Sequence, residues 1–553
     1  MTAPLLLIKP TEAKASSLPA YRYTKTFNNA NGSSNINSIA TDSQGNVYVA
    51  GEFLGTVTFG GSDTYTDAGG HGDAFVTKYS SNGTYLWTKA FDSTHSIGQG
   101  VYANGVAVNS LGNIYITGIF YGSVNFAGNS GTDNQTDAGG HGDAFLTEYN
   151  TSGAYGWTKT FNSTNSGSNG VYAGSVATDA SGNVYITGNF DGTINFNPTG
   201  SGGSQTSSNP NSFLVEYSSS GTYDFTKTFD TSGGNSFSQS VAIDSSGNIY
   251  ITGYFADTVI FDGSGGHDSQ SAGGNSGADD TFITKYASSG TYAWTKTFDI
   301  TNGWTNGWGI ATDSQGNIYA TGEFGGTVIF DGSGGHDSQT AAGSSYDTYL
   351  TKINSNGSYA WTKSFNTSAS GADSYGISVA TNSQGDVYVN GVFQGTVNFA
   401  GTSGTDNQTA GASHQNYYVT EYTTSGNYAW TRSLDTTNGT TDGWSGGAVA
   451  TDSLGNIYFA GDFTGTVVFD GVGGSDSRTS TAANGDIDDA FLTSYSVTPT
   501  SLATGTSITT TQAPDTGFGT PKNGESFNLL TITTLVVALF IMGYAYYRYG
   551  KIR

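Results

Sequence analysis

Short segments in which hydrophobic and polar residues alternate recur along most of the chain. One complete unit begins at Ser240, where the segments VAID and IYITGYF flank the turn SSGN, and it ends with TFITKY and YAWTKTF around the turn ASSG. Alternation with a period of two predicts β-strands, and a short Gly-containing turn between two such segments predicts a hairpin. Each unit therefore predicts two hairpins, which together give four antiparallel strands.

The unit repeats at a nearly constant interval. Its signature Gly-Asn/Asp-Val/Ile-Tyr starts at Gly45, Gly112, Gly182, Gly247, Gly316, Gly385 and Gly455, with spacings of 67, 70, 65, 69, 69 and 70 residues. In the second strand, Ile249 and Ile251 lie on one face and Tyr250 and Tyr254 on the other, so both faces must be covered. A ring of radially packed sheets covers both faces of every sheet, whereas a solenoid needs polar caps at its ends.

The two ends of the repeat region complement each other. The last unit stops after the strand 489–495 (DAFLTSY) and lacks a closing strand, while the segment 21–27 (YRYTKTF) has no partner of its own. The sequence therefore predicts an all-β fold, a seven-bladed β-propeller of four-stranded blades over residues 21–496 that is closed by the N-terminal strand. An additional Thr-Val-x-Phe segment, such as 258–261, either prolongs the second strand or forms a flap.

The patterns DAFVTKY, WTK-x-F and GNVYITG resemble the SBBP-type β-propeller repeat of bacterial surface proteins. The resemblance extends over all seven units. It implies a scaffold rather than a particular reaction.

Composition excludes several classes of protein. The chain of 553 residues has 82 Gly, 8 Pro and no Cys, so neither collagen, disulfide staples, thiolate zinc sites nor cysteine nucleophiles are possible. Acidic residues outnumber basic ones by 43 to 18, a net charge of −25, which disfavours nucleic acid as a partner. An aromatic content of 13% is too high for a disordered chain.

One face of the predicted ring carries the long loops, since the connections between second and third strands and between blades all lie there. Loops of this length are often functional, so we expect this face to make contacts. Aromatic residues near the start of the first strands are ligand-binding candidates: Tyr102, Tyr172, Phe237, Trp304, Trp308, Tyr375 and Trp444. Such rings can stack on sugars; alternatively, they plug the central channel or pack beneath the loops.

The repeated segment FDGSGGHDSQ offers oxygen ligands for calcium. The candidates are Asp262, Asp268, Asp331 and Asp337, echoed by Asp470 and Asp476. An ordinary polar turn has the same composition, and the spacing differs from that of an EF-hand. His71 and His141 recur in AGGHGDAF, where they either form hydrogen bonds in the loops or bind zinc. No other cofactor is indicated.

No constellation of catalytic residues stands out from the repeats. A nucleophile beside a base, a phosphate-binding loop and a usable Glu pair are all missing from the sequence pattern. The region 21–496 contains three Arg, too few for the convergent cluster of a sialidase site. The sequence therefore predicts that the protein is not an enzyme.

The C-terminal residues predict a surface location. Residues 497–528 form a Ser/Thr-rich stalk, residues 529–547 an uncharged span long enough for a transmembrane helix, and residues 548–553 a basic cytoplasmic tail. Residues 1–20 are interpreted as a possible remnant of an export signal.

The stalk also contains a motif that, with the apolar span and basic tail after it, resembles a sortase cell-wall sorting signal. The motif is Ala513, Pro514, Asp515, Thr516 and Gly517, with Ala513 in place of the usual Leu. The resemblance implies cleavage between Thr516 and Gly517 by a sortase-like transpeptidase; a plain membrane anchor is the alternative.

These features together predict a non-catalytic cell-surface binding or adhesion scaffold. Its propeller face would contact an extracellular glycan or a surface protein, and repeated weak sites would add by avidity. The alternative is a structural envelope protein that packs laterally without a specific ligand.

Overall fold

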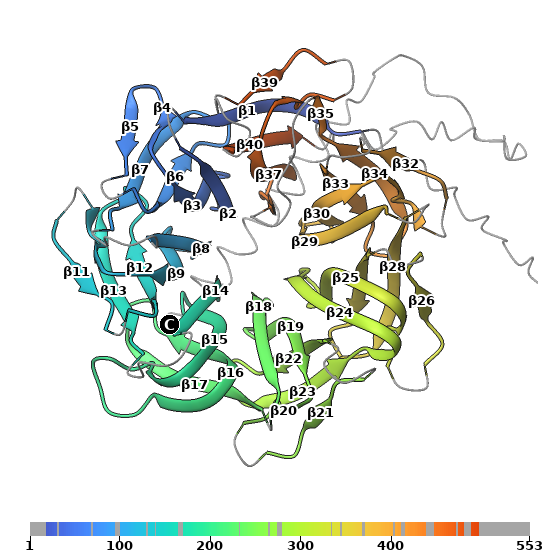
Figure 1. The fold of residues 1–553 in the computed structure, drawn as a ribbon, viewed down its shortest axis with the longest axis horizontal. Coiled ribbons are helices and arrows are strands. Elements are labelled where there is room, and N and C mark those ends of the chain that lie inside the picture. The colour runs from blue at the N-terminus through green and yellow to red at the C-terminus, as the bar shows by residue number, and fades with distance from the viewer. Residues whose placement is uncertain are drawn as a thin grey trace, which may run out of the picture. The chain divides into compact units, whose positions relative to one another are not determined.

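A computed structural model describes residues 18–496, except 30–31, 68–69, 94–99, 129–130, 139, 164–169, 232, 264–265, 274–278, 333–334, 343–345, 368–370, 402–403, 411–414, 438–446, 472–473 and 481–487. All regular elements in this part are β-strands. They form a β-propeller, a ring of radial sheets around a central channel (Figure 1).

Each repeat contributes four strands, counted from the channel outwards, except the last repeat, whose fourth strand comes from the N-terminus. The first strands are β2 (Ser34–Thr41), β8 (Val101–Val108), β14 (Val171–Thr178), β18 (Asn235–Ile243), β24 (Asp299–Thr312), β29 (Asp373–Thr381) and β36 (Ala448–Thr451). The second strands are β3 (Val47–Phe53), β9 (Ile114–Phe120), β15 (Val184–Asn195), β19 (Ile249–Ala256), β25 (Ile318–Ile329), β30 (Val387–Gln394) and β37 (Asn456–Phe463).

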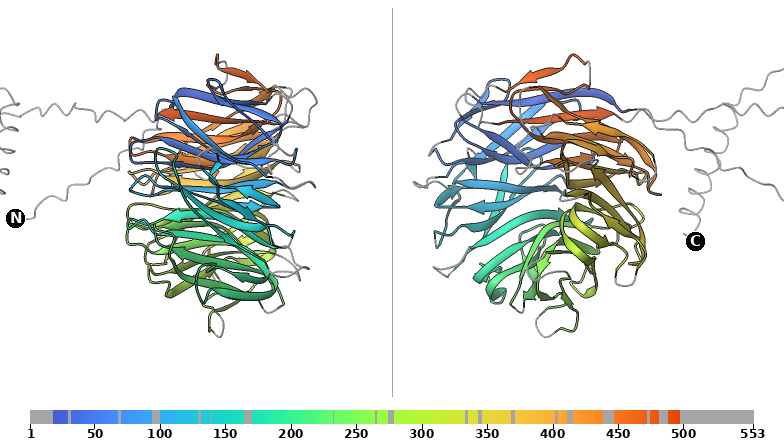
Figure 2. Two further views of the ribbon diagram at one scale, coloured as in Figure 1. Left: turned by 90° about the vertical axis from the view of Figure 1, so that its left-hand side faces the viewer. Right: turned by 45° about the vertical axis from the view of Figure 1, so that its right-hand side comes forward.

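The outer half of each sheet is built in the same way. The third strands are β6 (Asp73–Tyr79), β12 (Asp143–Tyr149), β16 (Ser204–Tyr217), β22 (Asp280–Tyr286), β27 (Asp347–Ile353), β33 (Asn416–Tyr422) and β40 (Asp489–Ser496). The outermost strands are β7 (Tyr85–Phe91), β13 (Tyr155–Phe161), β17 (Tyr223–Thr231), β23 (Tyr292–Thr297), β28 (Tyr359–Thr367), β34 (Tyr428–Ser433) and β1 (Ala20–Asn29). Neighbouring strands are antiparallel, and most run between the two faces of the ring (Figure 2).

The predicted closure of the ring is confirmed. Strand β1 pairs antiparallel with β40, with Tyr21 opposite Tyr495 and Thr26 opposite Phe491. The first residues of the propeller therefore complete the sheet that its last residues begin. The edge of β40 is covered in the same way as the third strand of every other repeat.

The tight turns follow from one acidic or amide residue and one glycine per repeat. Asp244 Oδ1 accepts the backbone N–H of Ser246 and Asn248, both at 2.9 Å, and Gly247 takes a φ of 80°. Tyr250 donates its hydroxyl to the same carboxylate at 2.9 Å. Side-chain acceptors of this kind fix short turns, which explains why the signature pairs these residue types.

The core lies between neighbouring sheets, as the two-faced hydrophobic pattern requires. Ile249, Ile251 and Phe255 pack with Tyr185 and Leu214 of the preceding sheet. On the opposite face of β19, Tyr250 packs with residues of the following sheet such as Ile310 and Ile318. A sheet such as that of β19 therefore contributes to two core clusters, one with each neighbour.

The Thr-Val-x-Phe segments form additional hairpins rather than a simple continuation of the second strand in most repeats. Val259 and Phe261 are fully buried, while Thr258 pairs with Ser271 on a further strand. The strands of these hairpins are β4 (Thr56–Gly60), β5 (Asp63–Thr66), β10 (Ser123–Asn125), β11 (Asn134–Thr136), β20 (Thr258–Ile260), β21 (Ser269–Ser271), β26 (Ser338–Thr340), β31 (Thr396–Asn398), β32 (Asn407–Thr409), β38 (Thr466–Val468) and β39 (Ser477–Thr479).

The hairpins connect one repeat to the outermost strand of the repeat before it. Strand β20 pairs with β17 through Asp230–Ile260 and Thr231–Val259, and β4 pairs with β1 in the same way. Strand β31 pairs with β28, and β38 with the short strand β35 (Asp435–Thr437). These pairings link neighbouring sheets at the rim of the ring.

This architecture corrects the predicted fold class. The prediction gave seven four-stranded blades, but the described strands form nine sheets of two to seven strands, and only four of those sheets have four strands. The reason is that burial of the Val and Phe of each extra segment forces a hairpin that bonds to the neighbouring repeat. The prediction also included a transmembrane helix, and no helix in the described residues is long and apolar enough for that role.

Several predicted segments lie outside the described residues. They are residues 1–17 of the N-terminal segment, the stalk at 497–528, the sorting-like motif at Ala513–Gly517, the span 529–547 and the tail 548–553. Trp444 also lies outside them.

Candidate binding site in the central channel

A β-bulge interrupts the first strand at the same position in nearly every repeat. The pairing register shifts between Ile36 and Ser38 in β2, and between Gly307 and Gly309 in β24. Equivalent shifts occur in β8, β14, β18 and β29. A bulge leaves one extra residue without a cross-strand partner and redirects its side chain.

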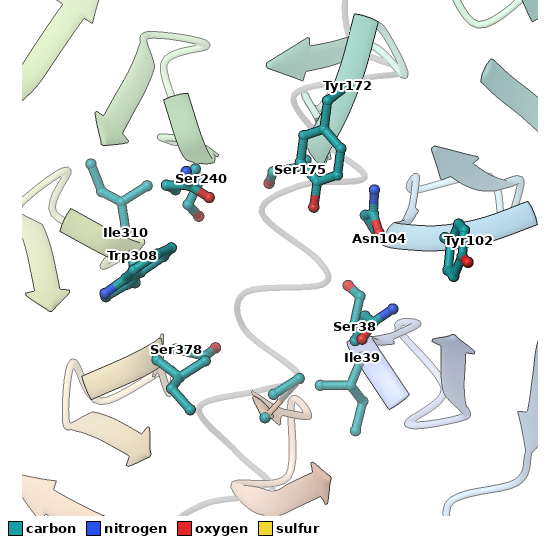
Figure 3. A pocket seen from close by; sticks show the side chains of 18 of the residues that line it. Ser38, Ile39, Tyr102, Asn104, Tyr172, Ser175, Ser240, Trp308, Ile310 and Ser378 are labelled. Atoms are coloured by element: carbon teal, nitrogen blue, oxygen red, sulfur yellow. The ribbon is translucent and has the colours of Figure 1, made fainter. Parts of the chain in front are cut away.

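The bulged residues line the central cavity, which has a volume of about 570 Å³. They are Asn37, Asn104, Gly174, Gln239, Trp308 and Ile377, with Gly447 at the corresponding place beside β36. Figure 3 shows Asn104 and Trp308 on opposite sides of this space. The bulge thus places one residue of each repeat in the channel, and the identity of that residue changes around the ring.

The positions after the bulge are nearly uniform. The next residue is small in every repeat, and the one after it is a branched aliphatic such as Ile39 or Val379. Three of the small residues are serines whose Oγ accepts a backbone N–H of the following repeat, for example Ser38 from Val106 at 3.1 Å and Ser175 from Val241 at 3.3 Å. These two positions make contacts between neighbouring repeats and keep nearly the same residue types. The residue type therefore varies mainly at the bulge.

Trp308 is held in a defined orientation. Its Nε1–H donates to Glu323, which also accepts the Nδ2–H of Asn306 at 3.2 Å. The indole packs against the ring of Tyr254 in a T-shaped arrangement, with 5.8 Å between centroids and an interplanar angle of 63°. Because these contacts fix the indole, Trp308 lines the channel as a preorganised aromatic ring.

Glu52 occupies the position equivalent to Glu323 on the other side of the ring. It accepts the Nδ2–H groups of Asn35 at 3.2 Å and Asn37 at 2.6 Å. Asn37 also donates to the carbonyl oxygen of Ala103 in the next repeat, at 3.1 Å. Unlike Glu323, which is 3% exposed, Glu52 is partly exposed and lines the cavity.

Burial raises the pKa of both carboxyl groups to about 7, although the amide and indole donors act in the opposite direction. Burial likewise raises the pKa of Tyr172 to about 12. At neutral pH this tyrosine is therefore uncharged and can donate its proton in a hydrogen bond, while the two glutamates are balanced between their charged and neutral forms.

Glu323 makes stability depend on pH. Its pKa rises from 4.5 in the unfolded chain to about 7, so the native state binds the proton more tightly and the unfolding free energy falls as pH increases through this interval. We expect Glu323→Gln to remove up to about 3 kcal/mol of that fall. Urea unfolding at pH 5 and pH 8 measures it; an unchanged difference between the two pH values would contradict the assignment.

The structure separates the aromatic candidates into two groups. Tyr102, Tyr172 and Trp308 line the cavity, together with Tyr121, which was not predicted. Trp304 instead packs on Tyr346 at 4.9 Å, and Tyr346 in turn contacts Tyr375 at 5.8 Å. Phe237 packs on Tyr254 at 5.2 Å. Trp304 and Tyr375 thus both pack on Tyr346 rather than line the channel, and Phe237 packs on the tyrosine that contacts Trp308.

Sequence reasoning missed the polar residues of the site. Asn37, Asn104, Gln239 and Glu52 were not selected because no single repeat marks them. A comparison of the repeats position by position would have found the bulge, which varies among Asn, Gly, Gln, Trp and Ile while its neighbours stay nearly constant.

The calcium candidates are engaged in their own turns. Asp262 accepts the backbone N–H of His267 at 2.8 Å and of Asp268 at 3.0 Å, and Asp331 has the same contacts with His336 and Asp337. These N–H donors lower the pKa of Asp331.

The second carboxylate of each turn has side-chain donors. Asp268 and Asp337 accept the hydroxyls of Tyr292 and Tyr359. Among the described residues no group of three or more His, Cys, Asp or Glu is placed to hold a metal, including around His71 and His141. Calcium binding therefore stays a prediction.

Two stretches of the chain, residues 23–52 and 229–254, match the family model of the SBBP β-propeller repeat. These two stretches are similar to the SBBP repeat. A curated relative, an uncharacterized WD repeat-containing protein of Acanthamoeba polyphaga mimivirus, is 33% identical over 168 residues. That match covers 28% of this chain and spans only 12% of the relative's length.

Solved structures with a similar fold include enzymes. A catalytically inactive virginiamycin B lyase from Staphylococcus aureus has 9% identity and a TM-score of 0.36, over 85% of this chain and 99% of that one. The polysaccharide lyase Uly1 has 11% identity and a TM-score of 0.41, over 83% and 90%. A gluconolactonase from Xanthomonas campestris has 8% identity and a TM-score of 0.30, over 72% and 87%.

These neighbours correct the prediction that the protein is not an enzyme. A propeller fold by itself gives no ground for excluding a reaction, because unrelated activities occur on the same fold. Likenesses this distant concern the fold alone, and they assign no substrate to this chain.

Proposed function

We propose that this propeller is a binding protein that holds a carbohydrate without acidic groups in its central channel. Sugars present apolar C–H faces and rings of hydroxyl groups, and they suit a cavity that combines aromatic faces with amide, hydroxyl and carboxyl groups. The cavity lining supplies both kinds of surface, through Trp308, Tyr102 and Tyr172 on one hand and Asn37, Asn104 and Gln239 on the other.

The observation that carries the proposal is the fixed indole of Trp308. It projects from a bulge into the channel, and Glu323 and Tyr254 hold it from behind. An aromatic face that is fixed before binding loses little conformational entropy when a ligand stacks on it. A half-exposed tryptophan with no such support would fit a role in packing equally well.

Charge restricts the ligand. The described lining of the cavity contains Glu52 but no Lys, Arg or His, and the whole chain has a net charge of −25. An anionic ligand would meet repulsion without a compensating cation. Neutral and basic sugars are therefore favoured over uronic acids or sulfated sugars.

The two tryptophans of one strand provide a matched test. We expect Trp308→Ala to weaken binding of a neutral oligosaccharide by tenfold or more, because the stacking face is lost. Trp304→Ala removes a ring of the same size that packs on Tyr346 outside the cavity, and affinity should then stay within about twofold. Calorimetric titration with oligosaccharides selected on a glycan array measures both.

Two results would overturn the proposal. One is equal loss of affinity in the two variants, and the other is the absence of any binding on an array of neutral and basic glycans. Ordered self-association without glycan binding would instead favour the laterally packing structural protein. The location at a cell surface rests on residues outside the described part of the chain and stays a prediction.

A further inference from the structure

The side of the channel formed by β2, β8 and β14 presents hydrogen-bond acceptors. Both N–H groups of the Asn37 amide are used, by Glu52 Oε2 at 2.6 Å and by the carbonyl oxygen of Ala103 at 3.1 Å. Asn104 similarly donates to the carbonyl oxygen of Ala173 at 3.0 Å. What Asn37 offers a ligand is therefore its amide oxygen, since a primary amide has two donor hydrogens. Asn104, with one hydrogen engaged, presents its oxygen together with one remaining N–H.

A carboxyl group and two aromatic rings complete this side. Glu52 is the one carboxyl group in the described lining of the cavity, and Tyr102 and Tyr172 line the wall beside it. Figure 3 shows Tyr102, Asn104 and Tyr172 opposite Trp308. Carboxylate, amide oxygens and tyrosine faces are together complementary to an ammonium group, which has three donors and no acceptor and is attracted by aromatic faces.

We propose that the carbohydrate bound in the channel is an amino sugar oligomer with free amines, one of which pairs with Glu52 while a neighbouring sugar ring stacks on Trp308. This inference rests on the proposed function and specifies its ligand. An oligomer suits this arrangement because the acceptor side and Trp308 lie on opposite sides of the channel, so that separate sugar units can contact each.

The environment of Glu52 explains why this side of the channel would bind an amine in preference to other hydrogen-bond donors. The groups that hydrogen-bond or interact electrostatically with its carboxyl are the uncharged Asn35 and Asn37 of its own sheet and the tyrosines Tyr102 and Tyr172 of the next two. No cation in the described lining neutralises it. An arriving ammonium supplies the missing counter-charge, and the pair then forms in a partly desolvated site, where it is worth more than on an open surface.

A set of three tetrasaccharides isolates the amine. The β-1,4-linked tetramers of glucosamine, N-acetylglucosamine and glucose differ only at C2, which carries an amine, an acetamide or a hydroxyl group. By calorimetry at pH 7.0 we expect the wild-type protein to bind the glucosamine tetramer about tenfold more tightly than the other two. Glu52→Gln should abolish that preference and leave affinity for the glucose tetramer within about twofold.

A matched control is available outside the channel. Glu421 is also buried with a pKa raised to about 7, and it accepts the Nε1–H of Trp430 in another part of the ring. Glu421→Gln should keep the preference for the amine. Trp308→Ala should weaken all three tetramers, which separates stacking from pairing.

The pH dependence of affinity gives an independent test of the pairing between the amine and Glu52. Glu52 has a pKa of about 7 without ligand, so below neutrality it must lose a proton to form the pair, and above neutrality the glucosamine amine loses its own. Affinity for the amine ligand should therefore fall on both sides of pH 7, whereas affinity for the glucose tetramer should not follow this profile. Glu52→Gln should remove the acidic limb.

The outcomes distinguish the two proposals. If the three tetramers bind wild-type protein equally, or if Glu52→Gln retains the amine preference, the inference is wrong and carbohydrate binding stands. If none of the tetramers binds, both the inference and the proposed function fail.

Discussion

Gly322→Ala is expected to displace the bulge of β24 and to weaken ligand binding in the channel by tenfold or more. Gly322 lies opposite Gly307 in the sheet, and a Cβ placed on it would overlap the carbonyl oxygen of Asn306 and approach Tyr349 Oη to 2.9 Å. Backbone cannot yield as a flexible side chain does, so the strand must shift. Asn306 and Trp308 both bind Glu323, and the shift therefore reaches the stacking face directly.

The expected cost is about 1–3 kcal/mol of unfolding free energy, the usual range for overpacking a well-packed core. Affinity for a neutral oligosaccharide should fall by tenfold or more, as for Trp308→Ala, since the indole loses its fixed position. Urea unfolding gives the first quantity and calorimetric titration gives the second. The ratio of the two effects distinguishes a displaced site from a protein that is merely less stable.

Gly404→Ala is the matched control. That glycine lies in a hairpin turn at the rim, where a Cβ would meet only the methyl group of Ala400 at an ordinary 3.6 Å. The variant should keep both stability and affinity within error of the wild-type protein. Wild-type affinity in Gly322→Ala would show that the position of the bulge does not matter for binding.

The same close approach explains why the repeat signature ends in Gly. Glycines equivalent to Gly322, such as Gly51, Gly188 and Gly253, would each bring a Cβ against the carbonyl oxygen of a residue just before the bulge. The motif GNVYITG was read as a turn followed by a strand, and both parts are correct. Its last glycine lies on the neighbouring strand, beside the bulge. The bulge itself is not visible in the hydrophobic pattern of a single repeat, because one inserted residue leaves the alternation on either side intact.

The two tryptophans of β24 illustrate the consequence of not predicting the bulge. Trp304 and Trp308 are four residues apart, and in a regular strand they would share a face. The register shift between Gly307 and Gly309 removes Trp308 from that series, so one ring packs on Tyr346 and the other lines the channel. Pattern and composition selected both residues, but they could not separate them.

Closure of the ring could be predicted from the sequence because it depends on a large, simple signal. An unpaired strand at one end and a missing strand at the other complement each other whatever the loop details. The hairpins at the rim could not be predicted in the same way. Their second strands are three polar residues, such as Ser-Gln-Ser at 269–271, and their partner in the preceding repeat is distant from the unit in which they occur.

Phe27→Ala is expected to open the ring where the chain ends meet. Phe27 is fully buried and packs with Phe59 at 5.5 Å, Phe75 at 5.8 Å and Tyr79 at 6.2 Å. Truncating such a ring costs about 3–5 kcal/mol. Strand β1 is joined to the last sheet only by hydrogen bonds and packing, so this loss shifts the equilibrium toward detachment of the strand rather than toward unfolding of the whole ring.

Phe229 offers an internal comparison with nearly identical packing. It is also fully buried and contacts Phe261 at 5.4 Å, Phe282 at 5.6 Å and Tyr286 at 6.2 Å, the last in the same stacked arrangement. Its strand, however, is tied to the neighbouring strand β16 by the turn at 218–222. Phe229→Ala should therefore lower global stability by a similar amount without releasing β17.

Native-state hydrogen exchange separates these effects. In Phe27→Ala the amides of 20–29 and of their partner strand 489–496 should exchange faster than those of the other sheets, because their opening no longer requires global unfolding. In Phe229→Ala the amides of 223–231 should change together with the rest of the core. Equal, global changes in both variants would mean that the ring does not open at its noncovalent seam, and that the hairpin pairing of β4 with β1 is enough to hold the chain ends together.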